Sequence, residues 1–86
     1  MTFQGSVVKE QGITFGIVIV KSHVLNSDSE KQNSIAFGNR AFGRIPIILM
    51  AQNSNGIPTY FGKRDIVDFL ASIDFRRIPW KEYTID

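Results

Sequence analysis

The clearest hydrophobic pattern lies in the second half of the chain. From Ile47 to Ala51 the residues are continuously apolar, which is typical of a buried strand. Asn55-Gly56 follows, and this dipeptide is a strong hairpin signal because both residues tolerate positive φ. After Gly62 the apolar residues recur at helical spacing, at Ile66, Phe69, Leu70 and Ile73. The pattern predicts a strand, a hairpin turn, a second strand and an amphipathic helix over about Lys63 to Ile73.

The hairpin register follows if Asn55 and Gly56 are the two central residues of a type I′ turn. Met50 then faces Phe61, and Ala51 faces Tyr60, so that Phe61 shares a face with Met50 and Tyr60 shares the other face with Ala51. Pro58 has no N–H to donate, which favours an edge position for the second strand of the hairpin.

The first half of the chain predicts a pair of strands. Thr2 to Val8 is a moderate strand pattern, and Glu10-Gln11-Gly12 is a reversal before the run from Phe15 to Val20, which is apolar except at Gly16. A strand that is apolar on both faces must be covered on both. We expect it to be central, with a helix over one face and another subunit over the other. The expected oligomer interface is Phe15, Ile17 and Ile19.

A helix is expected to begin near Asp28, because Ser27 and Glu30 form a capping box. Its helix propensity is poor, and we expect it to break by Gly38 or Gly43. The sequence AFGNR at 36–40 is followed at once by AFGR at 41–44. The favoured interpretation of this repeat is a helix end and a loop with two buried rings, and the alternative is a flexible basic-aromatic loop.

These elements define the predicted fold class. Pro79 precedes a final strand, WKEYTI at 80–85, which completes the order β-β-α-β-β-α-β. The prediction is an α+β protein forming a single small domain over residues 1–86, with a mixed five-stranded sheet and two helices in a two-layer sandwich.

The run from Ile45 through the Asn-Gly turn to the amphipathic helix resembles the second half of a thioredoxin-type domain. The resemblance covers about a third of the chain. The active-site cysteine pair of that family has no counterpart, because the sequence contains no cysteine. The resemblance therefore implies a similar strand-strand-helix unit and no function.

Composition narrows the classes of protein further. Without cysteine there is no disulfide framework, no thiolate zinc site and no cysteine nucleophile. A chain of 86 residues buries only about 60 to 65% of its unfolded surface, so a second subunit is expected to complete the core. No apolar run approaches the roughly 18 residues of a membrane span, and the first residues lack a signal-peptide pattern. We expect a soluble, cytoplasmic homo-oligomer, most simply a homodimer.

Charge is distributed unevenly along the chain. The net charge is +2, but the window from Lys31 to Arg64 contains five basic and no acidic residues, which gives +5, against −3 from five basic and eight acidic residues elsewhere. Aromatic residues lie beside cations twice, a combination that suits single-stranded nucleic acid. The candidate anionic-ligand surface comprises Arg40, Arg44, Lys63, Arg64, Arg76, Arg77 and Trp80.

No catalytic motif stands out. His23 is the only histidine and is interpreted as structural. Asp65 and Asp68 share a helix face, but acidic residues in the early turns of a helix are expected simply because they complement the macrodipole. Neither phosphate-loop pattern occurs, and we expect no cofactor or metal. The sequence favours a non-catalytic protein-interaction or oligomerisation module, and the second hypothesis is a protein that binds nucleic acid or another polyanion.

Overall fold

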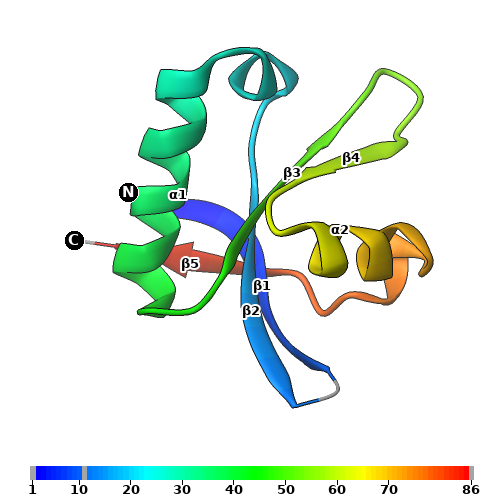
Figure 1. The fold of residues 1–86 in the computed structure, drawn as a ribbon. Helices are drawn as coiled ribbons and strands as arrows, with labels where there is room; N and C mark the ends of the chain where they lie inside the picture. The colour runs from blue at the N-terminus through cyan, green and yellow to red at the C-terminus, as the bar shows by residue number, and fades with distance from the viewer. Residues whose placement is uncertain (1, 11, 86) are drawn as a thin grey trace.

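The computed structural model describes residues 2–10 and 12–85. The elements are β1 (Thr2–Glu10), β2 (Ile13–Ile19), a short 3-10 helix η1 (Ser22–Asn26), α1 (Asp28–Phe42), β3 (Ile47–Gln52), β4 (Pro58–Phe61), α2 (Arg64–Ala71), a second 3-10 helix η2 (Phe75–Arg77) and β5 (Lys81–Thr84) (Figure 1). The predicted α+β fold, with five strands and two helices in the order β-β-α-β-β-α-β, is confirmed.

The five strands form one mixed sheet in the order β4-β3-β2-β1-β5. Only β2 and β3 run parallel, with α1 in the connection between them, while the other neighbouring pairs are antiparallel. The apolar strand β2 is central, as predicted. Its two faces are therefore the interior of the protein.

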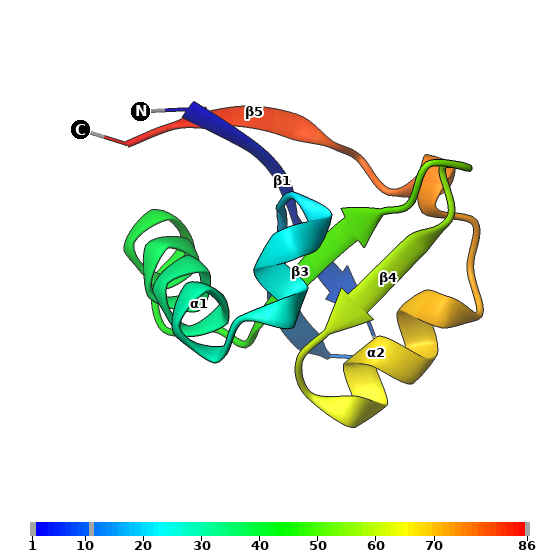
Figure 2. The ribbon, with the colours of Figure 1, turned by 90° about the horizontal axis from the view of Figure 1, so that it is seen from above.

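The two helices lie on opposite faces of the sheet, as Figure 2 shows. Ile66 and Leu70 of α2 belong to one buried cluster, and Ile35 of α1 packs against a separate one. The protein thus has three layers, and the predicted two-layer sandwich was wrong in this respect. Because β2 and β3 are apolar on both faces, each face needs its own cover. We call the two sides of the sheet the α1 face and the α2 face.

The α2 face is covered by α2 and by the chain that follows it. Ile66 and Leu70 pack on a cluster that includes Ile17 and Met50, and Ile78 extends this cluster beyond the helix. The Ser6 hydroxyl of β1 donates a hydrogen bond to the Pro79 carbonyl over 3.1 Å, which ties the connection to the sheet. Residues 74–80 therefore continue the cover across β1.

The α1 face depends on a close approach of the helix. A Cβ at Gly38 would lie 2.8 Å from Ile47 Cγ2, so this glycine lets α1 approach the sheet. The helix continues through Gly38 and ends at Gly43, where φ is 87°. At the other end the Ser27 hydroxyl accepts the Glu30 N–H over 3.3 Å, which is one half of the predicted capping box. The Ser27 N–H donates to the Val24 carbonyl and not to the Glu30 side chain.

The hairpin between β3 and β4 has a different register from the one predicted. Asn53 N–H donates to the Ile57 carbonyl, while the Asn53 side-chain oxygen accepts the N–H groups of Asn55 and Ile57. This side chain favours a three-residue loop, 54–56, in which Gly56 has φ of 78°. Asn55-Gly56 is thus in the turn, but not as a two-residue type I′ loop.

The extra loop residue shifts the pairing by one position, so that Met50 faces Tyr60 and Leu49 faces Phe61. A shift of one residue turns every side chain to the other face. Tyr60 accordingly packs on the α2 face and Phe61 on the α1 face, the reverse of the prediction.

The predicted reversal at Glu10-Gln11-Gly12 includes Gln11, which lies outside the described residues, and the β1–β2 pairing extends to Glu10↔Ile13.

Among the helices of the described residues, none has the length and apolar character that a membrane span requires.

Candidate functional site

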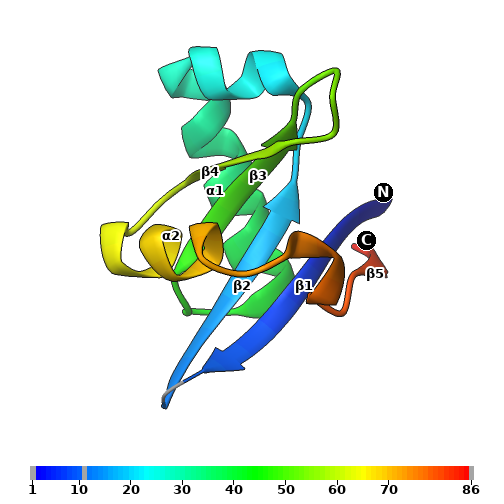
Figure 3. The same cartoon turned by 90° about the vertical axis from the view of Figure 1, so that its right-hand side faces the viewer.

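The residues proposed as an anionic-ligand surface lie in two places. A Cβ at Gly62 would lie 3.2 Å from the Ile47 carbonyl, so Lys63 and Arg64 follow directly beside the start of β3. Arg44 precedes that same strand start, and Arg40 lies in the last turn of α1. Figure 3 shows that α2 begins near the connection from α1 to β3. We call Arg40, Arg44, Lys63 and Arg64 the basic end.

Arg76, Arg77 and Trp80 do not join the basic end. They belong to the connection from α2 to β5, which is bound to Ser6 of β1 on the α2 face. In the sheet, β1 is separated from β3 by β2. The structure therefore divides the predicted surface instead of bringing its members together.

Carboxylates lie close to several cations of the acid-free window. Lys63 Nζ is 3.9 Å from Asp65 Oδ2, and Arg64 Nε is 3.9 Å from Asp68 Oδ2. Asp65 and Asp68 thus each have a cation beside them. The charge at the start of α2 is partly balanced.

Lys31, the first cation of the window, is engaged twice. Its ammonium lies 3.2 Å from Asp28 Oδ1 and 4.3 Å from the centre of the Phe61 ring, which is a cation–π distance. Lys31 therefore joins α1 to the edge strand β4, a role that its position in the sequence did not indicate.

Asp74 and Arg76 form the tightest ion pair of the described residues. Arg76 Nη2 lies 2.7 Å from Asp74 Oδ2, and Arg76 Nε lies 3.0 Å from Asp74 Oδ1. The Arg76 backbone N–H also donates to Asp74 Oδ1, which caps η2. The side-chain hydrogen bonds from Arg76, followed by its backbone bond, lower the pKa of Asp74 to about 2. Arg76 is thus occupied within its own turn.

Trp80 does not offer a free stacking surface. Its side chain is half-buried against the α2-face cluster, and its indole N–H donates to the Phe75 carbonyl over 2.9 Å. The ring therefore packs the connection from α2 to β5 against the sheet. Its place beside Arg76 and Arg77 in the sequence has a structural explanation.

The residues predicted as an oligomer interface lie under α2. Phe15 is 2% exposed and Ile17 is 0% exposed within the single chain, while Ile19 is half-buried. The cover that was expected from another subunit is α2 itself. These side chains therefore present little surface to a second copy.

An apolar groove with a volume of about 310 Å³ lies on the α1 face. It lies between α1 and the ends of β1 and β2. Figures 1 and 3 show these two strands diverging at this end. We call it the α1 groove. Its lining residues are Thr2, Phe3, Val18, Ile19, Val20, Asn33, Ser34 and Phe37.

The divergence of the strands starts at Gly5. A Cβ at this position would overlap the Ile17 carbonyl, so only glycine allows β1 to pass so close before it bends away. Pairing of β1 with β2 ends at Gly5↔Val18, while β1 stays paired with β5 from Gly5 to Thr2. The sequence pattern of alternating residues at 2–8 did not reveal this bend.

An aromatic cluster forms one wall of the α1 groove. The Phe3 ring contacts Phe37 edge-on at a centroid distance of 5.1 Å and stacks on Tyr83 at 5.4 Å. Phe42 contacts the same Tyr83 at 4.8 Å. Phe37 and Phe42, the two rings of the short repeat, are thus half-buried in α1, in agreement with the favoured interpretation of that repeat.

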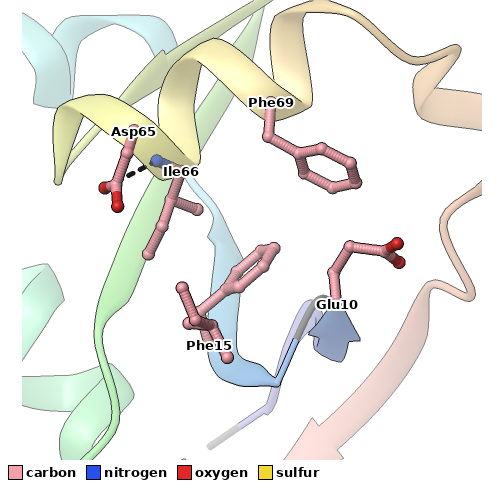
Figure 4. Close-up of a pocket in the computed structure, with 6 residues that line it drawn as sticks. Glu10, Phe15, Asp65, Ile66 and Phe69 are labelled. Atoms are coloured by element: carbon pink, nitrogen blue, oxygen red, sulfur yellow. Dashed lines mark hydrogen bonds between the residues drawn. The ribbon is translucent and has the colours of Figure 1, made fainter.

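A smaller cavity of about 100 Å³ lies beneath the start of α2. In Figure 4 the side chains of Phe15, Ile66 and Phe69 point into one apolar space, with the carboxylates of Glu10 and Asp65 on different sides of it. Asp65 accepts the Ile66 N–H over 2.9 Å and lies near Lys63, so its position is explained by the helix start.

Two further polar groups, His23 and the Tyr60 hydroxyl, differ in exposure. His23 is exposed, with 64% of its side chain accessible, and its Nε2 lies 3.6 Å from Glu30 Oε1. The Tyr60 hydroxyl is buried without a hydrogen-bond partner, and burial raises the pKa of Tyr60 above its usual 10.0. Across residues 2–10 and 12–85, no group of three or more His, Cys, Asp or Glu side chains is arranged to hold a metal ion.

Comparison with known proteins adds no relative. No family model, no curated protein sequence and no solved structure matches this chain.

Proposed function

We propose that this chain is a non-catalytic interaction module that binds another polypeptide through the α1 groove. The observation that carries the proposal is the groove itself, a hollow of about 310 Å³ with rings and aliphatic side chains as walls. Protein interfaces place apolar and aromatic anchors in such pockets and surround them with polar residues. Asn33 and Ser34 of α1 supply polar groups beside these walls.

The groove is a better candidate than the cavity beneath α2. That cavity holds about 100 Å³, roughly one small side chain, and Asp65 beside it is explained by the helix start. The α1 groove is three times larger in volume and is bordered by two strands and a helix. A rigid frame of this kind presents its walls in a fixed arrangement, which favours specific binding.

The test is to fill the groove from inside. In Ser34→Phe a ring replaces a small half-buried side chain that lines the groove, whereas Gln32→Phe adds the same ring at an exposed position of α1 that does not line it. Tagged wild type and both variants are used to capture partners from the source cells, with quantification by mass spectrometry. We expect proteins retained by the wild type and by Gln32→Phe to fall at least tenfold with Ser34→Phe. Equal recovery by all three would contradict the proposal.

The proposed working form is a homo-oligomer in the cytoplasm. A short chain with a small core gains from association, and Val7, Ile13 and Ile57 are exposed apolar side chains available for it. Light scattering at several concentrations measures the mass directly. A constant mass of 9.7 kDa would contradict oligomerisation.

A second proposed function is the binding of a polyanion such as single-stranded nucleic acid at the basic end. The observation that favours it is the approach of Gly62 to Ile47, which sets Lys63 and Arg64 beside the strand that Arg44 precedes. The nearby Asp65 and Asp68 weaken the local field, so we rank this function second.

Fluorescence titration with a labelled oligothymidine at low and moderate salt tests this second function. Contacts with phosphates release counterions, so the affinity should fall steeply as salt is added. We expect Arg44→Ala to weaken binding severalfold and Arg77→Ala, in the separate group, to leave it unchanged. Equal effects of both variants, or no binding at low salt, would remove the proposal.

A further inference from the structure

The turn between β3 and β4 contains the one Asn-Gly dipeptide of the sequence, Asn55-Gly56. An asparagine before a glycine is chemically labile, because the backbone nitrogen of the next residue attacks the side-chain amide carbon and glycine puts no side chain in its way. The turn geometry determines how far this reaction is open to the folded protein.

The leaving amide of Asn55 and its nucleophile are both uncrowded. Asn55 is exposed, and among residues 2–10 and 12–85 its side chain has no hydrogen-bond partner, while its backbone N–H donates to Asn53 Oδ1 over 2.8 Å. Apart from its chain neighbours, a Cβ at Gly56 would meet no atom within 4 Å. Solvent therefore reaches the amide, and no other residue blocks the approach of the Gly56 nitrogen.

Two hydrogen bonds hold Gly56 and slow its reaction. Its N–H donates to the Asn53 carbonyl over 2.9 Å, and its carbonyl accepts Gln52 Nε2 over 3.1 Å. The nucleophile is the deprotonated nitrogen, so the first of these bonds must break before the attack. Exposed loops open locally at a much smaller free-energy cost than core elements. The fold therefore slows the reaction without preventing it.

The other four asparagines are fixed by the fold, and none of them precedes a glycine. The side-chain oxygen of Asn53 accepts two backbone N–H groups of the turn, and the side-chain amide of Asn39 donates to two carbonyls beyond the end of α1. Asn26 and Asn33 lie in η1 and α1, where the helical backbone holds the side-chain carbon away from the next nitrogen. Asn55 is therefore set apart by both its neighbour and its freedom.

We propose that Asn55 is a modification site, at which the folded protein deamidates spontaneously to a mixture of isoaspartate and aspartate. The Gly56 nitrogen passes its proton to a solvent base and forms a bond to Asn55 Cγ. The Cγ–Nδ2 bond breaks, and Nδ2 takes up a proton from solvent and leaves as ammonia. One water molecule then opens the five-membered succinimide ring. The net reaction takes up water, releases ammonia and needs no oxidant, reductant or enzyme.

The two ways of opening the ring have different consequences for the turn. Attack of water at Cγ gives aspartate, which leaves the main chain unchanged. Attack at the Asn55 backbone carbonyl gives isoaspartate, whose main chain runs through Cβ and Cγ and is one atom longer. The bonds from Asn53 to Ile57 close a loop of fixed length, so isoaspartate should weaken them. Either product lowers the net charge from +2 by one unit.

The test is incubation of the intact protein for several weeks at mildly alkaline pH, beside a capped peptide of residues 52–58. Ion exchange separates the charge variants, and peptide mapping by mass spectrometry locates them. Methyl transfer from labelled S-adenosylmethionine by a protein isoaspartate methyltransferase identifies isoaspartate. We expect the folded protein to lose the Asn55 amide more slowly than the peptide, but about tenfold faster than any other asparagine amide of the protein.

Three results would overturn the proposal. An intact Asn55 amide in the folded protein, while the peptide reacts, would mean that the turn blocks the attack. Faster loss at Asn53 or Asn39 would mean that the free side chain is not the decisive feature. Aspartate without any methyl-accepting product would mean direct hydrolysis of the amide and not a succinimide.

Variants of the turn separate the mechanism from general ageing. Gly56→Ala keeps the amide and puts a methyl group beside the nucleophile, and Asn55→Gln moves the amide one carbon further away. Each should react about tenfold more slowly at position 55, and Ser54→Ala should age like the wild type. Because φ of Gly56 is 78°, Gly56→Ala strains the turn, so amide spectra of all three variants report their folding. A wild-type rate in a folded Gly56→Ala or Asn55→Gln variant would contradict the proposal.

Discussion

The two faces of the sheet are each covered by one helix, yet they are closed to different degrees. On the α2 face, α2 and the chain after it bury a continuous cluster that includes Ile48, Met50 and Leu70. On the α1 face the buried side chains are Val18, Ile47 and Leu49, and partly exposed rings surround them. The difference arises because residues 74–80 extend the cover on one face, while β1 bends away at Gly5 on the other. Stability is thus concentrated on the α2 face, and recognition is proposed on the α1 face.

The largest effect on stability is expected from a substitution that leaves a cavity on the α2 face. Leu70 is 0% exposed, and Leu70→Ala should lower the free energy of unfolding by about 2 to 5 kcal/mol, since it removes apolar contacts and leaves a cavity. Urea denaturation followed by circular dichroism measures the loss. Val67→Ala on the same helix serves as the control, because Val67 is only half-buried and should cost less. Equal losses would contradict the view that Leu70 anchors this face.

The second prediction concerns the α1 face, where one added carbon atom should disturb the packing of a ring. A Cβ at Gly16 would lie 2.5 Å from Phe42 Cδ2, so Gly16→Ala should displace the ring and cost about 1 to 3 kcal/mol in unfolding free energy. The double variant Gly16→Ala/Phe42→Leu should show a smaller loss than the sum of the two single variants. Additive losses would mean that the two residues do not interact in this way.

The third prediction concerns a buried, unpaired hydroxyl on the α2 face. Tyr60→Phe removes a buried hydroxyl without a partner and should raise the unfolding free energy by about 1 kcal/mol. Because burial raises the pKa of Tyr60 above 10.0, ionisation favours the unfolded state, so the stability falls as the pH rises from 10.0 through the folded value. Denaturation of both proteins at pH 8 and above pH 10 should show a smaller alkaline loss in Tyr60→Phe. Equal alkaline losses would contradict the assignment.

The smallest effect is expected at the exposed turn of Asp74 and Arg76, in the connection that extends the cover of the α2 face. Because the pKa of Asp74 is lowered to about 2 from 3.8, its stabilising contribution is present above pH 3.8 and is lost as the pH falls through about 2. Asp74→Asn should therefore flatten the fall in melting temperature between pH 4 and pH 2. Arg76→Gln should produce a similar flattening, since it removes the partner. An unchanged acid slope in both variants would rule out this pair as its source.

The local elements of the fold were predictable because their signals lie within a few residues. The stripe through Ile66 and Leu70 predicted α2, and Ser27 with Glu30 predicted the start of α1. The doubly apolar run in β2 predicted its central place. Its second cover was assigned to another subunit because the sequence does not show which face each helix takes.

The features that the sequence pattern missed depend on single contacts between distant or unexpected groups. The hairpin register depends on the Asn53 side chain, which binds the Ile57 N–H and lengthens the loop by one residue. The α1 groove depends on Gly5 passing the Ile17 carbonyl, a contact between two strands. The sequence grouped Arg76 and Arg77 with the other basic residues, but they lie in the connection that is bound to β1, and β2 separates β1 from the strand beside the basic end. Each of these outcomes is decided by tertiary geometry.

The pairing of β1 with β5 has a mechanical consequence. Thr2 faces Thr84, so the two ends of the described chain lie together at one end of an antiparallel pair. Tension applied between these ends loads the hydrogen bonds one after another, as in opening a zipper, because the bonds run across the strands along the direction of pull. The fold should therefore yield at low force by peeling β5 away, and the aromatic contact between Phe3 and Tyr83 would be among the first to break.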